Sequence, residues 1–381
     1  MALIFRRKCL RHCFPYFSTS AEVKVENDTP KFRTDKTNPA DHTKADIGLF
    51  YTLPQQLALR DLFGKRHGFP TPFLQLCHTF RETCIMVRKP GLELLHYLKN
   101  ADYTKPINKY VIYGRKGSGK TMVVNYAVHY AYLQGWLLVN LAWVPLWLSR
   151  PQQVSPSSSN PDNLNLIGRS VSWLQQFKRQ NLKLLTENQL PIQNDYVWNK
   201  RESSKVGDSL LSMVDYGISR GTFSTDVINI LLKEVKLMSK SGLIKTLVVI
   251  DGYNALFRSE SKVMDTHRNI VPPNKLNPLK AFIDLTIADW HSGAAILTCD
   301  QLAAGDNNES YFPHDLLSTE GYEHLYPFVP IEVPRYSDQE FENALEYYRD
   351  RKWLRTRSGD TELKFLTGRV GYELMRICAP L

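Results

Sequence analysis

The sequence predicts an α/β protein of the P-loop NTPase class, AAA-like in type, with a parallel sheet flanked by helices. Two observations carry this prediction. A short apolar strand runs into the motif G-x-x-x-x-G-K-T at 114–121, and a continuously apolar run, Thr246 to Ile250, ends in Asp251. Strand, glycine-rich loop and helix in that order are the context of a phosphate-binding loop. A strand buried on both faces of a parallel sheet is expected to be apolar throughout.

The composition is that of a folded chain with a sizeable core. The chain has 381 residues, of which 43% are hydrophobic and 23% charged. Its longest apolar run, 136–148, has 13 residues and contains Pro145, which is too short to span a bilayer, so we expect no membrane span. The net charge of +10 weakly favours a polyanionic partner.

The first twenty residues resemble a targeting signal. Residues 1–20 contain arginines, a lysine and several hydroxyl side chains, and the first acid is Glu22. This pattern predicts a mitochondrial transit peptide and hence the matrix, and the alternative is a basic arm that stays attached. The six cysteines include no C-x-x-C pair, which indicates a reducing compartment. Residues 21–72 are predicted to form an N-terminal arm or linker.

The nucleotide-binding domain is predicted to span 73–335. Helical spacing of apolar residues in 73–100 indicates two helices separated by Pro90. The strand at 110–113 is followed by the loop, a helix over 122–134 and a second strand at 136–141. The crossover rule makes these two strands parallel.

An insertion is predicted within this domain, at about 149–215. Lys120 and Asp251 are 131 residues apart, more than the intervening strand and helices need. Residues 149–162 are rich in Pro, Ser and Asn and predict a surface loop, followed by amphipathic helices at 171–185 and 225–238. The string N-K-R-E at 199–202 has Glu where the guanine-reading N-K-x-D motif needs Asp, so we reject it as a base reader.

The loop supplies the candidate nucleotide and metal ligands. Backbone N–H groups of a curled glycine-rich loop cradle phosphates, Lys120 can reach the outer phosphates, and the Thr121 hydroxyl can ligate Mg²⁺. Asp251, at the end of its strand, is the predicted partner of Thr121 at the metal. The candidate nucleotide-binding residues are Gly114, Arg115, Lys116, Gly117, Ser118, Gly119, Lys120 and Thr121.

The sequence assigns no catalytic residue. Asp251 stands where P-loop proteins have the Walker B aspartate. ATPases of the AAA type usually carry Glu directly after that aspartate, but here Gly252 follows. Without a group that orients water, the site should bind nucleotide well and turn over slowly, unless a base comes from elsewhere. A further strand at 294–297 ends in Thr298, which we interpret as a polar sensor beside the γ-phosphate.

A C-terminal helical lid domain is predicted over 336–381. It opens with a capping box, Ser337 to Glu340, and a second helix is predicted at 371–378. Five basic residues lie around Trp353 in the sequence: Arg349, Arg351, Lys352, Arg355 and Arg357. This cluster either contacts RNA, forms a solvated charged face, or serves a nucleotide-kinase lid.

Several strings that are not generic to P-loop proteins resemble the death-associated protein three family of the mitochondrial small ribosomal subunit. They are M-V-R-K-P at 86–90, E-L-L-H-Y-L-K-N at 93–100, Y-V-W-N-K-R-E-S at 196–203, D-G-Y-N-A-L at 251–256 and D-W-H-S-G-A at 289–294. The resemblance covers about 73 to the C-terminus.

This resemblance implies an AAA-like core, a guanine nucleotide, GTP or GDP, at the loop, and assembly with small-subunit rRNA and other mitochondrial ribosomal proteins. It also implies a link to apoptosis. From the residues alone ATP remains open. The alternative function is a free mitochondrial matrix NTPase or nucleotide kinase.

Overall fold

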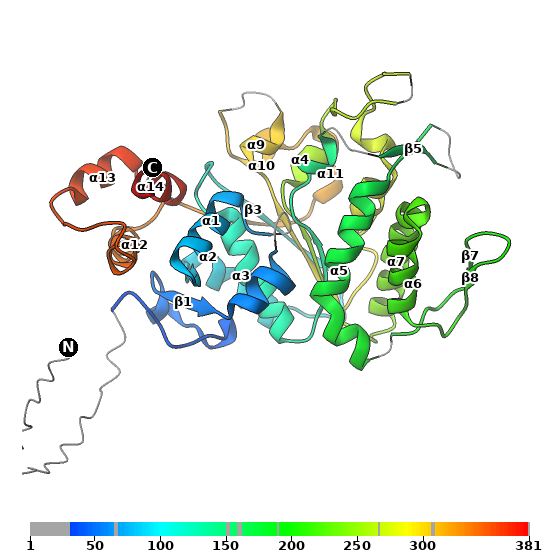
Figure 1. Ribbon diagram of the computed structural model, residues 1–381, viewed down its shortest axis with the longest axis horizontal. Coiled ribbons are helices and arrows are strands. Elements are labelled where there is room, and N and C mark those ends of the chain that lie inside the picture. The colour runs from blue at the N-terminus through cyan, green and yellow to red at the C-terminus, as the bar shows by residue number, and fades with distance from the viewer. Residues whose placement is uncertain are drawn as a thin grey trace, which may run out of the picture.

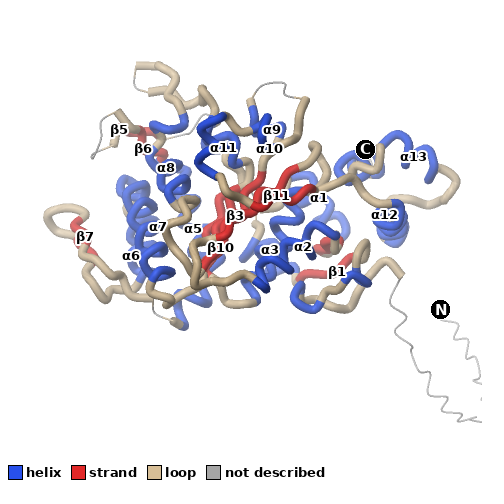
Figure 2. The backbone as a smooth tube through the Cα atoms, turned by 180° about the vertical axis from the view of Figure 1, so that it is seen from behind, coloured by secondary structure: helices blue, strands red, loops and turns tan. Residues whose placement is uncertain are grey.

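A five-stranded parallel sheet forms the centre of the protein (Figures 1 and 2). The computed structural model describes residues 31–64, 68–149, 153–157, 162–188, 190–265, 267–305 and 309–379, so the predicted transit peptide at 1–20 lies outside the described residues. Across the sheet the strands are β11 (Val329–Glu332), β3 (Asn108–Tyr113), β10 (Gly293–Thr298), β9 (Thr246–Ile250) and β4 (Leu137–Leu141). The predicted parallel α/β fold is confirmed.

The strand order brings the candidate site together. β10 lies between β3 and β9, and Leu297 of β10 is in register with Val111 on one side and Ile250 on the other. The three strands therefore end at one edge of the sheet, where ligands bind in open α/β sheets. The phosphate loop follows β3, and Asp251 follows β9.

Alternate strand residues face two separate cores. In β9, Val248 and Ile250 belong to one core, and Leu247 and Val249 belong to the other. This alternation explains why the strand is apolar along its whole length. Helices cover both faces (Figure 1). One face carries α2 (Lys89–Asn100) and α3 (Lys120–Leu133); the other carries α5 (Ile167–Glu187), α6 (Leu210–Ser219), α7 (Ser224–Lys240) and α8 (Asn277–Asp284).

The two helices predicted over 73–100 are interrupted by a strand. α1 (Thr71–Phe80) ends at Arg81, whose φ of 52° is left-handed, and β2 (Thr83–Met86) follows. β2 pairs antiparallel with β1 (Phe50–Leu53), which lies in the region predicted to be an arm or linker. The helical prediction is wrong at β2 because pairing with a distant segment overrides the local spacing. β1 is followed by a π-helical segment, η3 (Gln56–Leu62).

The span between β4 and β9 supplies a complete helical layer. Both predicted amphipathic helices are confirmed as α5 and α7, and they pack on the sheet with α6. The predicted surface loop at 149–162 contains β5 (Val154–Pro156), which forms a hairpin with β6 (Leu164–Leu166). A second hairpin, β7 (Tyr196–Val197) with β8 (Ser203–Ser204), projects from the domain and carries the N-K-R-E string (Figure 1).

Three helices end the chain. The predicted helices are confirmed as α12 (Asp338–Asp350), with its capping box from Ser337 to Glu340, and α14 (Gly371–Cys378); α13 (Asp360–Thr367) lies between them. A third apolar core joins them to β1, α1 and β2, with Phe50, Phe80 and Tyr347 among its members. The N-terminal segment thus helps to fasten the C-terminal helices to the main domain.

The basic cluster predicted around Trp353 is largely neutralised. Three of its five cations lie in ion pairs: Arg349 with Glu346 and Asp360, Arg351 with Glu82, and Arg357 with Glu346. Trp353 packs edge-on against Phe80, with 4.5 Å between ring centroids. The interpretation of this cluster as an RNA contact therefore loses most of its charge and its aromatic platform.

Shorter helices surround the carboxyl edge of the sheet (Figure 1). They are α4 (Pro145–Leu148), α9 (Gln301–Ala304), α10 (Pro313–Leu316) and α11 (Thr319–Leu325). Within the described ranges, no helix is both long and apolar enough to cross a membrane.

Candidate nucleotide-binding site

The loop after β3 adopts a backbone that only glycine tolerates at key positions. Gly114 has φ 145°, and a Cβ there would lie 2.5 Å from the carbonyl oxygen of Val333. Gly119 has φ 101° and precedes the first residue of α3. Residues that carry a side chain rarely adopt such φ angles, so the path of the backbone requires glycine at these positions of the motif. The predicted strand, loop and helix are all present in this order.

Lys120 lies inside the loop and is almost fully buried. Its Nζ donates to the carbonyl oxygens of Gly114 at 2.8 Å and Arg115 at 3.0 Å, and it forms an ion pair with Asp300 Oδ2 at 2.9 Å. Asp300 follows β10, which explains how a residue distant in sequence reaches the loop. Three protein oxygens therefore hold the ammonium group, at the position of the motif where a lysine binds phosphate as a point charge.

Thr121 and Asp251, the predicted metal pair, are in direct contact. Thr121 Oγ1 donates to Asp251 Oδ2 at 2.9 Å, and Thr298 Oγ1 donates a short hydrogen bond to Oδ1. Burial raises the pKa of Asp251 to about 6, while the hydroxyl groups of Thr298 and Thr121 act in the opposite direction. Both carboxylate oxygens are thus occupied and oriented by threonines.

The predicted role of Thr298 as a phosphate sensor is not what the structure shows. Its side chain is fully buried, and its hydroxyl accepts from the Gly252 N–H at 2.7 Å while donating to Asp251. Because the hydroxyl already makes both bonds, Thr298 orients the carboxylate. Asp300, two residues after Thr298, forms the ion pair with Lys120.

The residues present fit a magnesium ion of the P-loop kind. The described residues contain no group of three or more His, Cys, Asp or Glu side chains that could hold a metal by themselves. Mg²⁺ at such a loop takes few protein ligands and completes its octahedron with phosphate oxygens and water. Thr121 and Asp251 offer the oxygen donors this arrangement needs.

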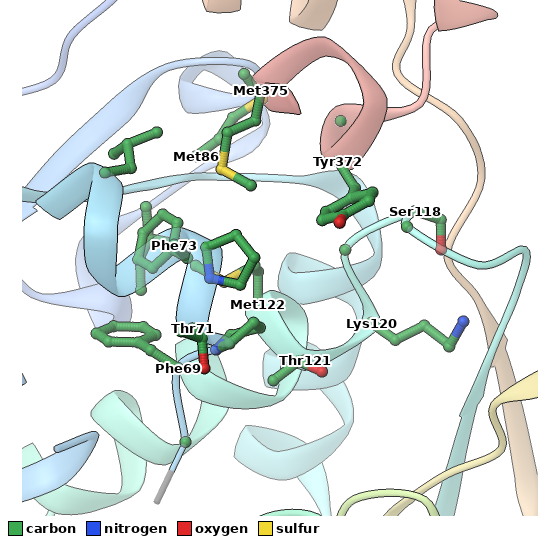
Figure 3. A pocket seen from close by; sticks show the side chains of 18 of the residues that line it. Phe69, Thr71, Phe73, Met86, Ser118, Lys120, Thr121, Met122, Tyr372 and Met375 are labelled. Atoms are coloured by element: carbon green, nitrogen blue, oxygen red, sulfur yellow. The ribbon is translucent and has the colours of Figure 1, made fainter. Parts of the chain in front are cut away.

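A cavity of about 670 Å³ adjoins the loop and extends into an apolar region. In Figure 3, Phe73, Met86 and Tyr372 lie around this region, while Thr121 and Lys120 lie at the phosphate end. Phe69 and Met375 also line it. An apolar pocket lined by aromatic side chains beside a phosphate loop suits a nucleobase.

Sequence reasoning missed this apolar region. Its side chains come from β1, from α1 and the segment before it, from β2, and from α12 and α14, parts of the chain that only the fold brings together. The string F-P-T-P-F at 69–73 is the one local signal, and it reads equally well as a loop. The N-K-R-E string at 199–202 does not line the cavity; Asn199 and Glu202 instead bond each other at 2.6 Å.

Arg88 is the second feature that the sequence did not indicate as a site residue. Its buried guanidinium donates to the Ser118 carbonyl oxygen at 2.7 Å and to the Pro334 carbonyl oxygen at 3.0 Å, and pairs with Glu340 at 3.0 Å. It also lies 4.8 Å from the ring centroid of Tyr336. Arg88 thus connects the phosphate loop to the start of α12. Arg88 lies in the string M-V-R-K-P at 86–90, one of those on which the family resemblance rests.

No carboxylate among the described residues of the cavity is free to act as a general base. Among the described residues that line the cavity, Asp251 and Asp300 are the carboxylates, and both are already bonded, to threonine hydroxyls and to Lys120. Gly252 has φ 77°, and a Cβ there would lie 3.1 Å from both Trp143 and Pro145. A glutamate at this position therefore has neither the backbone nor the space it needs.

Comparison with known proteins places these features in a family context. The family model of mitochondrial ribosomal death-associated protein 3 matches residues 85–377. The small ribosomal subunit protein mS29 of Mus musculus is 35% identical over 98% of this chain and 96% of its own length. The protein of the same name from Bos taurus is 36% identical over 94% of this chain and 91% of its own length.

Solved structures resemble the chain only distantly. A Walker-type ATPase of Pyrococcus abyssi aligns with a TM-score of 0.39 at 14% identity, covering 76% of this chain and 65% of that one. The FIGL-1 AAA domain aligns with a TM-score of 0.31 at 10% identity, covering 86% of this chain and 72% of that one.

Proposed function

Because the chain belongs to the mitochondrial ribosomal death-associated protein 3 family, we propose that it is a structural component of the mitochondrial small ribosomal subunit. In this proposal the cavity beside the P-loop holds a guanine nucleotide with Mg²⁺, and the bound nucleotide stabilises the fold. The partners are small-subunit rRNA and neighbouring ribosomal proteins, which suit a chain of net charge +10.

The nucleotide part of the proposal is supported by the arrangement at the end of β3. Lys120 lies within the loop, the Thr121 hydroxyl contacts Asp251, and an apolar pocket adjoins both. Gly114 to Thr121 would surround the phosphates, and Thr121 with Asp251 would hold the metal. When bound, Mg²⁺ would neutralise phosphate charge; the residues around it orient and enclose the nucleotide.

A structural role is supported by the absence of a base among the described cavity residues. Gly252 leaves no carboxylate where hydrolysing ATPases place one, and this observation carries the preference for a binder. The lid supports the same reading, because the Arg88–Glu340 ion pair ties α12 to the phosphate loop. Product release by lid opening would require this buried pair to break.

The guanine preference is supported by the family resemblance alone. In the cavity, the lining carboxylates Asp251 and Asp300 both stand at the phosphate end, so no acid faces the apolar region where a base would lie. The link to apoptosis likewise stays a prediction from the resemblance.

Nucleotide binding would stabilise the folded chain by mass action. A ligand that binds only the folded state at a concentration 100 times its Kd adds about 2.7 kcal/mol to the free energy of unfolding. The C-terminal helices and the segments that follow the strands of the central sheet both line the cavity, so a bound nucleotide would contact both and hold them together. In this proposal the nucleotide would stay bound as a permanent part of the structure.

The test combines identification of the ligand with sedimentation. Wild type and Lys120→Ala are expressed in mitochondria, small molecules are extracted from the purified protein for mass spectrometry, and matrix extract is sedimented. We expect close to one guanine nucleotide per wild-type chain, co-sedimentation with small subunits, and loss of both nucleotide and thermal stability in Lys120→Ala. A free, slowly sedimenting protein with multiple-turnover hydrolysis or phosphoryl transfer would instead establish the matrix NTPase or kinase.

A further inference from the structure

A second hollow adjoins the phosphate loop. Its volume is about 530 Å³, and it shares Lys116 with the nucleotide cavity. Its walls come from the loop itself, from residues 309–312 before α10, and from the chain on either side of α12 and α13. We call it the basic hollow, defined by Arg115, Lys116, Tyr311, Phe312 and Arg335.

The basic hollow carries unpaired positive charge. Arg115, Lys116 and Arg335 are all exposed, and in the part of the chain that the structure describes none of the three side chains has an ion-pair partner. Glu309 is the acid in its lining. This contrasts with the cluster around Trp353, where most cations are paired. Like charges gathered in a concave surface raise the local potential and attract anions.

An aromatic platform lies in the same hollow. Tyr311 and Phe312 stack with 4.6 Å between ring centroids and 25° between planes, and Phe312 remains 49% exposed. The Arg115 guanidinium lies 5.5 Å from the Tyr311 ring centroid. The ring of Tyr113, at the end of β3, lies beside Phe312 with 6.1 Å between the two ring centroids. The rings are therefore held in place by neighbours, while about half of the Phe312 side chain stays exposed.

Unpaired cations beside an exposed, supported aromatic ring are the features that bind single-stranded nucleic acid. Cations contact phosphates, and bases stack on the ring. We propose that the basic hollow binds a single-stranded segment of RNA, with phosphates against Arg115, Lys116 and Arg335 and a base on Phe312. An acidic peptide would satisfy the cations and leave Phe312 without a role, so RNA fits the whole surface better.

This inference rests on the proposed ribosomal role for its source of RNA, and it is independent of whether a nucleotide occupies the neighbouring cavity. The two sites are adjacent through Lys116, so variants are chosen outside the P-loop. Arg335 supplies charge and Phe312 supplies the stacking face. Arg355, an exposed cation of the cluster around Trp353 that has no ion-pair partner among the described residues, is the matched control.

The experiment measures binding of the full chain to a fluorescein-labelled twelve-nucleotide oligouridylate by anisotropy, from 50 to 200 mM KCl. Arg335→Glu should weaken binding about tenfold and reduce the salt slope by about 0.7 for the lost phosphate contact. Phe312→Ala should weaken binding about tenfold and leave the salt slope unchanged, since stacking involves no counterion release. Arg355→Glu should stay within about twofold, because a distant exposed charge is screened.

Each outcome decides the proposal. Unchanged affinity in Phe312→Ala and Arg335→Glu, or an equal loss in Arg355→Glu, would overturn it. Thermal melting and binding of a fluorescent GDP analogue are recorded for every variant, so that misfolding and failure of the nucleotide site are seen separately. In intact small subunits, ultraviolet irradiation should attach rRNA nucleotides to the peptide containing Tyr311 and Phe312; chemical crosslinks from that peptide to an acidic protein, with no attached nucleotide, would replace RNA as the partner.

Discussion

Arg88 and Glu340 form a buried ion pair, with 3.0 Å between Nε and Oε1, although they are 252 residues apart in the chain. The guanidinium of Arg88 also donates to the Ser118 carbonyl oxygen, and Glu340 accepts from the Ser337 N–H as part of the capping box of α12. One ion pair therefore joins three elements: the strand-end segment before α2, the phosphate loop and the lid.

Replacing Arg88 by Met should lower the free energy of unfolding by about 3–5 kcal/mol, because it leaves Glu340 as an uncompensated buried charge. The Ser118 carbonyl oxygen also loses a donor, so nucleotide affinity should fall as well. Urea denaturation and binding of a fluorescent GDP analogue measure the two effects. The double variant Arg88→Met with Glu340→Leu removes both charges and should regain part of the stability, but not the affinity. A single variant as stable as wild type would contradict this account.

Gly252→Glu should not create a hydrolase. The new side chain would require a left-handed backbone and would meet Trp143 and Pro145, so we expect a loss of about 1–3 kcal/mol in stability and no turnover in the range of about 1–100 s⁻¹ seen for phosphotransfer enzymes. Gly252→Ala is the control for the backbone cost without the carboxylate. Rapid phosphate release by Gly252→Glu in a single-turnover assay would show that the crowding relaxes and that a base alone was missing.

The phosphate end of the site could be predicted from the sequence because its signals are local. The glycine motif and the apolar run before Asp251 each lie within one segment, and both strands and the helix after the loop are found as predicted. The fold then brings Thr121 to Asp251 without any further assumption. Local patterns fail where a role depends on neighbours in space.

Thr298, Arg88 and the apolar region of the cavity show this limit. Thr298 ends the expected strand, but its hydroxyl donates to Asp251 because β10 lies beside β9. The spacing of residues in the sequence does not predict which neighbour this hydroxyl contacts. Arg88 becomes important only through Glu340, which is far along the chain. β2 is misread as helix because its partner strand β1 lies in a segment that looks like a linker.

Acidification from pH 7.5 to 5 should destabilise the protein through His129. Burial lowers the pKa of His129 to about 4 from an ordinary 6.5, and Tyr51 Oη lies 3.3 Å from its Nδ1. Between these values the unfolded chain binds more protons, so stability rises with pH across this window and the expected loss at pH 5 is about 2 kcal/mol. His42 nearby has a lowered pKa and acts in the same direction, whereas the raised pKa of Asp251 acts in the opposite one.

His129→Gln isolates this contribution, since glutamine can still bond Tyr51 but cannot titrate. The difference in the free energy of unfolding between wild type and His129→Gln should change by about 2 kcal/mol between pH 7.5 and 5, in the direction that favours the variant at pH 5. Parallel pH profiles for the two proteins would assign the acid sensitivity to other groups.

Asp300→Asn should shift nucleotide preference toward the triphosphate. Asp300 forms an ion pair with Lys120 at 2.9 Å, so its carboxylate stands where added phosphate charge would approach and repels it. Removing this charge should favour a triphosphate over a diphosphate by roughly 1 kcal/mol, about fivefold. Asparagine can still accept from the Leu302 N–H, so the cap of α9 is kept. Competition binding of GTP and GDP against a fluorescent analogue gives the ratio, and an equal change in both affinities would mean that Asp300 acts only through the freedom of Lys120.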